Sequence, residues 1–351
     1  MSAGLSLGGS RRTPLDAPGP TRRVVGALAG ILAACDTLTG TSLDAGTRHH
    51  QTAALNRVGR GPVDHRERAG LVERALGLLD LKAQSVAATT GGSSLPVYRV
   101  TDEAGRAFAL RVGPQGASVT LDREVRNLRQ AAAIGIPCPQ VLARVDDDQV
   151  SALLTTWEAG VPLLEAALVD SGQVGPLSYA AGGLQARLHR EGLAAISADL
   201  DAGWARPHSP AEDHALRACP DDGPSTLLHL DFHPLNILID QGALTAVLDW
   251  VNAGIGDARR DVARTISILA LDGAEMEGPI GRMADKMLIA WLRGYQAEGG
   301  ELTAMKPYVV WAGLATIRDL SGKRSVDQLQ RMIARVNAWR IGGEQIDDLD
   351  W

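Results

Sequence analysis

The chain has 351 residues, of which 45% are apolar and 22% are charged, as is typical of a globular protein large enough for two packed lobes. Its net charge of −6 disfavours a nucleic-acid partner, and no apolar run is long enough to span a membrane. The three cysteines, Cys35, Cys138 and Cys219, are far apart and odd in number, so they give neither a zinc pattern nor a disulfide framework and fit a reducing cytoplasm.

Residues 1–63 are expected to form a disordered or loosely structured extension. Residues 1–22 are rich in Gly, Pro, Ser and Arg, and residues 36–62 are polar and without pattern. Between them, Val24–Cys35 reads VVGALAGILAAC. This segment resembles a lipoprotein signal that ends at Cys35, and it is also compatible with a short amphipathic or buried helix.

A helix is expected to open at Asp64, because Glu67 stands three residues later as in a capping box. Its apolar stripe follows helical spacing at Leu71, Ala75, Leu78 and Leu79. Ser85–Val112 then predicts strand, turn, strand, turn and strand. The backbone N–H and hydroxyl groups of the first turn suit a phosphate, although such a turn is more often structural; it is Gly91-Gly92-Ser93-Ser94.

One cation and one carboxylate in this region are expected to pair. In the strand that ends at Val112, alternation places Arg111 on the face opposite Leu110. The helix that follows has an apolar stripe at Leu121, Val125, Leu128 and Ala132, and Glu124 lies on the same face. A carboxylate on a packed face is rare unless it is paired, and Arg111 is the partner we choose. A solvated Arg111 on a strand edge and a Glu124 that reaches solvent stay open as alternatives.

The rest of the chain predicts two more strands and then helices. The strands are Gln140–Val145 and Gln149–Thr156. A helical core stripe comes next, at Leu177, Ala181, Leu184 and Leu188. Three further helices are expected at Arg282–Gly299, Ala304–Asp319 and Ser325–Trp339, the last beginning with a Ser325–Gln328 capping box. The acidic residues after 343 predict a solvated tail.

The most informative segment is Leu227–Trp250, which reads LLHLDFHPLNILIDQGALTAVLDW. His229, Asp231 and Asn236 have the H-x-D-x-x-x-x-N spacing of a kinase catalytic loop. A predicted hairpin follows, with a turn at residues 240–242. Asn236 enters this hairpin and Asp249 leaves it, so their oxygens are expected at the same end, where they would suit Mg²⁺.

These residues resemble the aminoglycoside phosphotransferase and choline kinase-like family. HLDFHPLN and LDW are similar to its H-G-D-x-H-x-x-N and I-D-W or V-D-W motifs, and Leu230 departs from the usual Gly. The resemblance covers residues 85–265 by motifs, and the later helices more loosely. It implies an α+β fold, a bilobal protein-kinase-like fold with a small antiparallel-sheet N-lobe and a mostly helical C-lobe. The expected boundaries are a nucleotide-binding N-lobe over 64–156, a catalytic and acceptor-binding C-lobe over 157–343, and a tail over 344–351.

The resemblance also implies the roles of single residues. Asp231 would orient and deprotonate the acceptor hydroxyl, and Asn236 and Asp249 would hold Mg²⁺. Arg111 stands where kinases place a phosphate-pairing Lys, with Glu124 as its partner. The implied nucleotide-binding residues are Gly91, Gly92, Ser93, Ser94, Arg111, Glu124, Thr156 and Trp157, the last two at the hinge that pairs with adenine. His229 and His233 are interpreted as structural, and Asp261 as an anchor beneath the catalytic loop.

The predicted reaction is transfer of the γ-phosphoryl group of ATP or GTP, with Mg²⁺, to a hydroxyl of a small molecule. Aminoglycoside-like or amino-sugar acceptors are favoured because Asp231, Asp249 and the tail are acidic and attract cations. Choline-like and macrolide-like acceptors are alternatives. A protein kinase is disfavoured because Trp250-Val251 follows Asp249 and no D-F-G or A-P-E occurs.

Two other classes of protein are less compatible with the sequence. A non-catalytic nucleotide-binding scaffold is disfavoured because Asp231, Asn236 and Asp249 are all present. A kinase works where ATP is, so we favour a helix over a lipid anchor at Cys35 and expect a cytoplasmic enzyme without a membrane partner. The sequence leaves the oligomeric state open.

Overall fold

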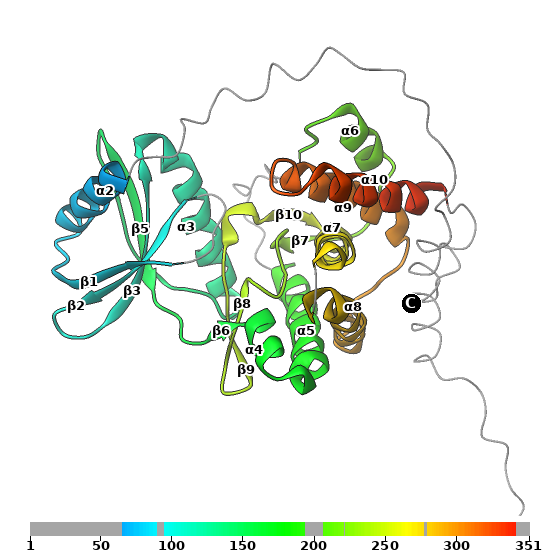
Figure 1. The fold of residues 1–351 in the computed structure, drawn as a ribbon, viewed down its shortest axis with the longest axis horizontal. Coiled ribbons are helices and arrows are strands. Elements are labelled where there is room, and N and C mark those ends of the chain that lie inside the picture. Colours follow the sequence, from blue (N-terminus) through cyan, green and yellow to red (C-terminus); the bar gives the residue numbers. More distant parts are fainter. Residues whose placement is uncertain (1–64, 90–94, 194–205, 221, 277–278, 342–351) are drawn as a thin grey trace, which may run out of the picture.

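The computed structural model describes residues 65–89, 95–193, 206–220, 222–276 and 279–341. The expected N-terminal extension with Cys35, the Gly91–Ser94 turn and the acidic tail lie outside these ranges. An antiparallel sheet with two helices occupies one side of the molecule, and a mostly helical part occupies the other (Figure 1). The predicted fold class is confirmed.

The small part is built on a five-stranded sheet with the strand order β1-β2-β3-β5-β4. All neighbouring strands are antiparallel. The strands are β1 (Ala83–Ala88), β2 (Val97–Asp102), β3 (Ala107–Pro114), β4 (Val141–Asp146) and β5 (Val150–Thr156). Strand β3 lies in the middle of the sheet because it pairs with both β2 and β5, so a side chain on β3 is well placed to be held rigidly.

Helix α2 (His65–Leu78) packs on one face of this sheet. Its buried Val72 and Ala75 belong to a core with alternate residues of β3 and β5, such as Leu110. The predicted stripe was partly wrong, because Leu78 is 44% exposed. The helix face that packs on the sheet is rotated toward Val72. Leu78, the last residue of the helix, therefore points into solvent.

Helix α3 (Ser118–Ala133) covers the other face and follows a short 3₁₀ turn, Gln115–Ala117. Leu121, Val125 and Leu128 are buried as predicted, whereas Ala131 takes the buried place expected for Ala132. Because β3 alternates, its residue 111 faces this helix while residues 110 and 112 face α2.

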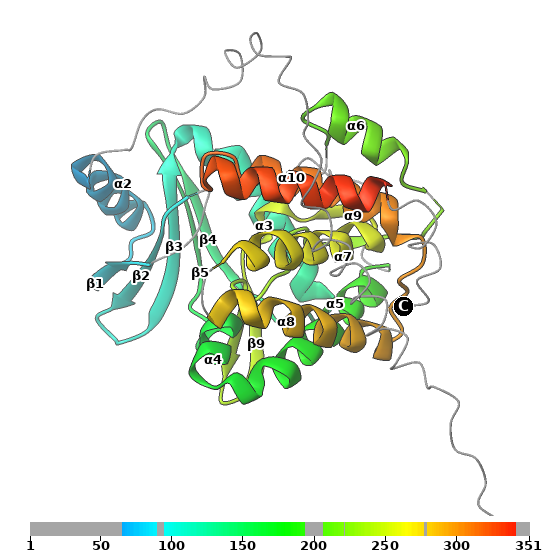
Figure 2. The same ribbon diagram turned by 45° about the vertical axis from the view of Figure 1, so that its right-hand side comes forward.

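The large part is mostly helical, and Figure 2 shows its helices lying side by side. Helix α5 packs along α8, and α9 packs against both α7 and α10. The Ser325–Gln328 capping box is confirmed, since Ser325 Oγ accepts from Gln328 N and Gln328 Oε1 accepts from Ser325 N. The helices are α4 (Leu163–Val169), α5 (Val174–Gly192), α6 (Pro210–Arg217), α7 (Ala258–Ser267), the π-helix Ile268–Gly273, α8 (Pro279–Ala297), α9 (Met305–Leu320) and α10 (Val326–Ile341). Within the described ranges, no helix combines the length and the apolar character that a bilayer crossing requires.

The α5–α8 contact depends on glycine. A Cβ on Gly182 of α5 would lie 1.9 Å from the carbonyl oxygen of Trp291 on α8. A Cβ on Gly294 of α8 would lie equally close to the carbonyl oxygen of Tyr179 on α5. Only a residue without a side chain lets the two backbones approach this closely.

Two small sheets carry the segment that the sequence singled out. Strands β6 (Val161–Pro162), β8 (Ile237–Asp240) and β9 (Ala243–Val247) form one, and β7 (Ser225–Leu228) and β10 (Gly254–Asp257) form the other. The chain crosses between them twice, from β7 to β8 and from β9 back to β10. The predicted hairpin is confirmed as β8–β9, so the two crossings lie side by side.

Candidate active site

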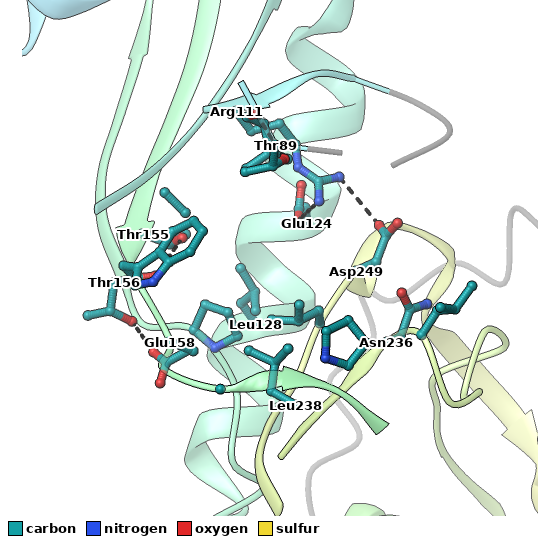
Figure 3. A pocket seen from close by; sticks show the side chains of 18 of the residues that line it. Thr89, Arg111, Glu124, Leu128, Thr155, Thr156, Glu158, Asn236, Leu238 and Asp249 are labelled. Carbon is teal, nitrogen blue, oxygen red and sulfur yellow. Dashed lines mark hydrogen bonds and ion pairs between the residues drawn. The ribbon is translucent and has the colours of Figure 1, made fainter. Parts of the chain in front are cut away.

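A cleft of about 490 Å³ lies between the small sheet and the β8–β9 hairpin (Figure 3). Apolar side chains from the sheet and from the hairpin line it, including Val97, Ala109 and Leu238. Polar and charged groups gather toward one end, where Arg111 and Asp249 meet. A flat apolar ring with a charged extension has the shape and chemistry that such a cleft accommodates.

The predicted hinge residues, Thr156 and Trp157, line this cleft. The amide of Thr156 donates to the carbonyl oxygen of Gln140 at 3.0 Å, so the sheet already uses this donor. If a backbone N–H of this segment pairs with a nucleotide base, it must therefore belong to a residue after Thr156. The Arg99 guanidinium lies 4.9 Å from the centre of the Trp157 ring, which fixes that side chain by a cation–π contact.

Arg111 connects the two lobes. Its Nη2 lies 3.4 Å from Glu124 Oε1 on α3, and its Nη1 lies 3.3 Å from Asp249 Oδ1 after β9 (Figure 3). All three side chains are largely buried, and both carboxylates approach one guanidinium. The expected Arg111–Glu124 contact is present, whereas the contact with Asp249 was not expected from the sequence.

The Glu124 carboxyl is held in an unfavourable environment. Burial raises its pKa to about 7; the Arg111 charge opposes this effect and the Asp249 charge adds to it. Glu124 Oε2 is buried and has no hydrogen-bond partner in the described part of the chain. Burial lowers the pKa of Arg111, but the charges of Glu124 and Asp249 outweigh it and raise that pKa, so the guanidinium stays charged.

Asp231 and Asn236 lie together in the β7–β8 crossing. Asn236 Nδ2 donates to the backbone oxygen of Asp231 at 3.0 Å and lies 3.3 Å from Asp231 Oδ2. Burial would raise the pKa of Asp231, but the charge and hydrogen bond of His233, and the charge of Arg264, hold it well below its usual range. Asp231 is therefore ionised at neutral pH and ready to accept a hydrogen bond from a hydroxyl.

Asp261 anchors this crossing from beneath. Its buried carboxylate accepts from the backbone N–H groups of His229 and Leu230, at 3.2 and 2.6 Å, and lies 2.9 Å from His189 Nε2. Leu230 has φ of 62°, in the left-handed region where glycine costs least. This conformation explains physically why a Gly suits the position and shows that Leu230 does not prevent the loop from forming.

His229 is a structural histidine in this geometry. Its Nε2 lies 2.9 Å from the carbonyl oxygen of Leu248, and its Nδ1 accepts from the amide of Asp231. One ring nitrogen donates and the other accepts, so the ring is neutral. Burial lowers the pKa of His229 despite the nearby carboxylates, in agreement with this arrangement.

Residues 85–308 match the sequence profile of the Phosphotransferase enzyme family (APH), which is more than half of the chain. The chain belongs to this family. Family membership and the enzyme class, a small-molecule kinase, are therefore as predicted. No curated protein sequence matches the chain.

Solved structures of the same fold agree with the family assignment. This phosphotransferase is similar to an aminoglycoside-3'-phosphotransferase of type VIII, with 23% identity, a TM-score of 0.52, and coverage of 72% of this chain and 99% of that one. It is also similar to a thermostable mutant of aminoglycoside phosphotransferase APH(4)-Ia in its apo form, with 17% identity, a TM-score of 0.57, and coverage of 78% and 99%. A ternary complex of a variant of that enzyme with AMP-PNP and hygromycin B has 18% identity, a TM-score of 0.51, and coverage of 78% and 98%. At these identities the similarity supports the fold alone.

The residues of this phosphotransferase fit a magnesium ion. Asn236 turns its amide nitrogen toward Asp231, which leaves its oxygen for the cleft that it lines together with Asp249. No group of three His, Cys, Asp or Glu side chains in the described ranges could hold a metal. Mg²⁺ commonly uses one or two protein oxygens and completes its shell with phosphate oxygens and water. The pair Asn236 and Asp249 is sufficient by this criterion.

The sequence did not reveal three residues around the site. Asn127 on α3 bonds to the backbone after Asp249, Arg264 on α7 donates to the carbonyl oxygen of Leu230 in the β7–β8 crossing, and Glu158 lines the cleft after Trp157. Only Asn127 carried a signal, because it stands three residues after Glu124 and therefore near the same helix face. Arg264 and Glu158 act through tertiary neighbours that no spacing in the sequence indicates.

Proposed function

We propose that this enzyme transfers the γ-phosphoryl group of ATP or GTP, as its Mg²⁺ complex, to a hydroxyl of a small molecule. The observation that carries the proposal is the contact of Arg111 with Asp249. Within the described residues, Arg111 is the only Lys or Arg that lines the cleft. The contact places its guanidinium against the carboxylate of Asp249, in the second crossing. Beside it, in the first crossing, stand Asp231 and Asn236.

The nucleotide is assigned to the cleft, with its base between the apolar walls and its phosphates toward Arg111. The guanidinium would pair with phosphate oxygens through two donors at once. Glu124 would hold Arg111 in place from the side of α3. Under this proposal residues 64–156 form the nucleotide-binding lobe, and residues 157–343 supply the catalytic loop and the acceptor site.

Asp231 is assigned to the acceptor. Its carboxylate would accept a hydrogen bond from the acceptor hydroxyl, orient that oxygen toward the γ-phosphorus and take its proton as the new bond forms. Asn236 Nδ2 and His233, which lies 3.5 Å from Asp231 Oδ1, fix the orientation of the carboxylate. Mg²⁺ held by Asn236 and Asp249 would neutralise charge on the phosphates. As the oxygen–phosphorus bond to the acceptor forms, the bond from the γ-phosphorus to the bridging oxygen of the β-phosphate would break, and the nucleoside diphosphate would leave. Because the transition state is loose, alignment by these side chains is the main contribution of the protein.

The acceptor class follows from charge. An acceptor hydroxyl at Asp231 would lie beside an ionised carboxylate, which attracts an amine-bearing molecule and repels an anionic one. The complex of a similar enzyme with AMP-PNP and hygromycin B supports a nucleotide and a hydroxylated antibiotic as the two substrates. We therefore favour aminoglycoside-like or amino-sugar acceptors, with other hydroxylated antibiotics or metabolites second. An enzyme that draws on ATP or GTP would work in the cytoplasm.

The test combines an acceptor panel with one variant. Nucleotide consumption is measured with aminoglycosides, amino sugars, choline, macrolides and carboxylated sugars. Asp231→Asn should keep nucleotide binding and lower kcat at least about a hundredfold, the scale of losing a positioned general base. Asp240→Asn makes the same chemical change at an exposed position of the hairpin turn and should retain full activity. Near-normal turnover by Asp231→Asn would refute the assigned role, and turnover with anionic acceptors alone would refute the charge argument.

A further inference from the structure

Asp249 has a strained backbone that its surroundings hold in place. Its φ and ψ are 60° and 69°, in the left-handed region. Such a conformation costs about 1 kcal/mol for a residue with a side chain, so it persists only where neighbouring contacts determine it. On the N-terminal side these contacts are clear. Leu248 donates its N–H to Asn236 O at 2.7 Å, and its carbonyl oxygen lies 2.9 Å from His229 Nε2.

On the C-terminal side the chain forms a 3₁₀ turn, Trp250–Asn252, that closes with a 3.3 Å bond from Ala253 N to Trp250 O. The Trp250 ring is fully buried, donates from Nε1 to Val247 O at 2.9 Å and packs edge-on against His229. These contacts hold the ring of Trp250. The bond from Ala253 N is the one backbone hydrogen bond to the Trp250 carbonyl oxygen in the described part of the chain, and it is long.

Asn127 on α3 adds a side-chain donor to this turn. Its side chain is fully buried, and Nδ2 donates to Trp250 O at 2.7 Å and to Ala253 O at 3.2 Å. The amide can have only this orientation, because its oxygen would repel two carbonyl oxygens if the group were flipped. A single side chain thus holds both ends of the turn that begins directly after Asp249.

In the part of the chain that the structure describes, one polar atom of the Asn127 side chain is left without a partner. Asn127 Oδ1 is buried and has no hydrogen-bond partner among the described residues, which costs about 1–3 kcal/mol. Asn127 stands three residues after Glu124, so one face of α3 carries both the partner of Arg111 and the group that holds the turn after Asp249. The helix therefore contacts both parts of the charged end of the cleft.

We propose that Asn127 is a positioning residue for the metal-binding carboxylate: it holds the turn Trp250–Asn252 so that Asp249 keeps its left-handed backbone and presents its carboxylate at the charged end of the cleft that Asn236 also lines. The inference rests on the proposed function, in which Asp249 and Asn236 hold Mg²⁺. Asn127 contacts neither metal nor substrate in this role. Through it, the position of α3 sets the geometry of the metal site.

The central variant is Asn127→Leu, which has nearly the same shape and no donor. It leaves two buried carbonyl groups without their side-chain partner, and Asp249 can relax out of its strained conformation. Removing a group that orients a metal ligand weakens metal binding by about 10- to 100-fold. Calorimetric titration with ATP plus Mg²⁺ should therefore show at least about tenfold weaker binding, while titration with ATP in EDTA should change less than about twofold.

Two other variants make the result interpretable. Val72→Ala opens a cavity in the core between α2 and the far face of the sheet, so it lowers stability without touching α3. It should leave the effect of Mg²⁺ on ATP binding unchanged. Asp249→Ala should abolish that effect. Asn127→Ser, which leaves room for a bridging water, replaces Asn127→Leu if the latter does not fold.

A second measurement needs neither metal nor nucleotide. Hydrogen–deuterium exchange of the peptide containing residues 249–254 should be faster in Asn127→Leu than in wild type and unchanged in Val72→Ala. If Asn127→Leu retains the wild-type Mg²⁺ effect while Asp249→Ala loses it, the positioning role is refuted and the metal site stands. If Asp249→Ala retains it, the assigned metal site is wrong, and the inference falls with it.

Discussion

The buried Glu124 carboxyl should make the stability of the ligand-free enzyme depend on pH. Its pKa is about 7 in the folded protein, against an ordinary value of 4.5, because burial removes the carboxylate from water. Between these values the folded state keeps a proton that the unfolded state has lost. The contribution of Glu124 to stability is therefore fully present below pH 4.5 and is lost as pH rises through about 7.

The size of the effect follows from the two pKa values. Each unit of difference corresponds to about 1.4 kcal/mol, so the interval from 4.5 to about 7 corresponds to about 3 kcal/mol. This applies to a carboxyl that is almost fully buried, so solvent screening reduces it little. Glu124→Gln keeps the shape and has no titrating group. The wild type should therefore lose about 2–3 kcal/mol more than Glu124→Gln between pH 5 and pH 8.

The assay is urea unfolding at several pH values, in EDTA and without nucleotide, because metal at Asp249 or phosphate at Arg111 would change the charges around Glu124. Other groups, such as the neutral buried His229, titrate equally in both proteins and cancel in the difference. Glu103→Gln removes an exposed carboxyl from the β2–β3 turn and is the matched control. If the stability difference between wild type and Glu124→Gln is the same at pH 5 and pH 8, the burial argument is wrong.

Three other predictions test separate parts of the structure. Arg111→Ala and Glu124→Ala should each raise the nucleotide KM, and the double variant should cost less than the sum because the pair acts as a unit; strict additivity would contradict this. Leu230→Gly should be less stable than wild type by about 1–4 kcal/mol through its lost core contacts, yet more stable than Leu230→Ala by about 1 kcal/mol because φ is positive; unfolding in urea would reveal the opposite order. Gly182→Ala should lower stability by about 1–3 kcal/mol or more because α5 and α8 must separate, while Gly175→Ala, on the same helix with open space, should not; equal melting temperatures would refute the close contact.

Local patterns in the sequence were sufficient for the central motif. Asp231, Asn236 and Asp249 lie within one short stretch, and the hairpin between them follows from alternating apolar residues and a short turn. The Arg111–Glu124 contact was also accessible, since strand alternation and helix periodicity show which face each side chain occupies. Each of these inferences needs only the geometry of a single element or of two consecutive ones.

The same patterns did not predict which face of a helix is buried where the packing surface of its partner decides this. Helix α2 has enough apolar residues for two neighbouring stripes, and the sheet selected the one with Val72, which leaves Leu78 exposed. The predicted hinge residues line the cleft, but the amide of Thr156 donates to Gln140 and is not available to a ligand. Register and docking decide such details, and neither is encoded in one segment.

The sequence by itself determined the family, the bilobal fold and the hairpin that joins Asn236 to Asp249, because those features depend on residue type and local spacing. Only the tertiary structure decided that Arg111 reaches Asp249 across 138 positions, and that Asn127 holds the turn beyond it. The physical reason is that Asn127 bonds to backbone carbonyl groups, which every residue possesses. A contact with the backbone leaves no signature in the partner's sequence, so it becomes visible only when the chain is folded.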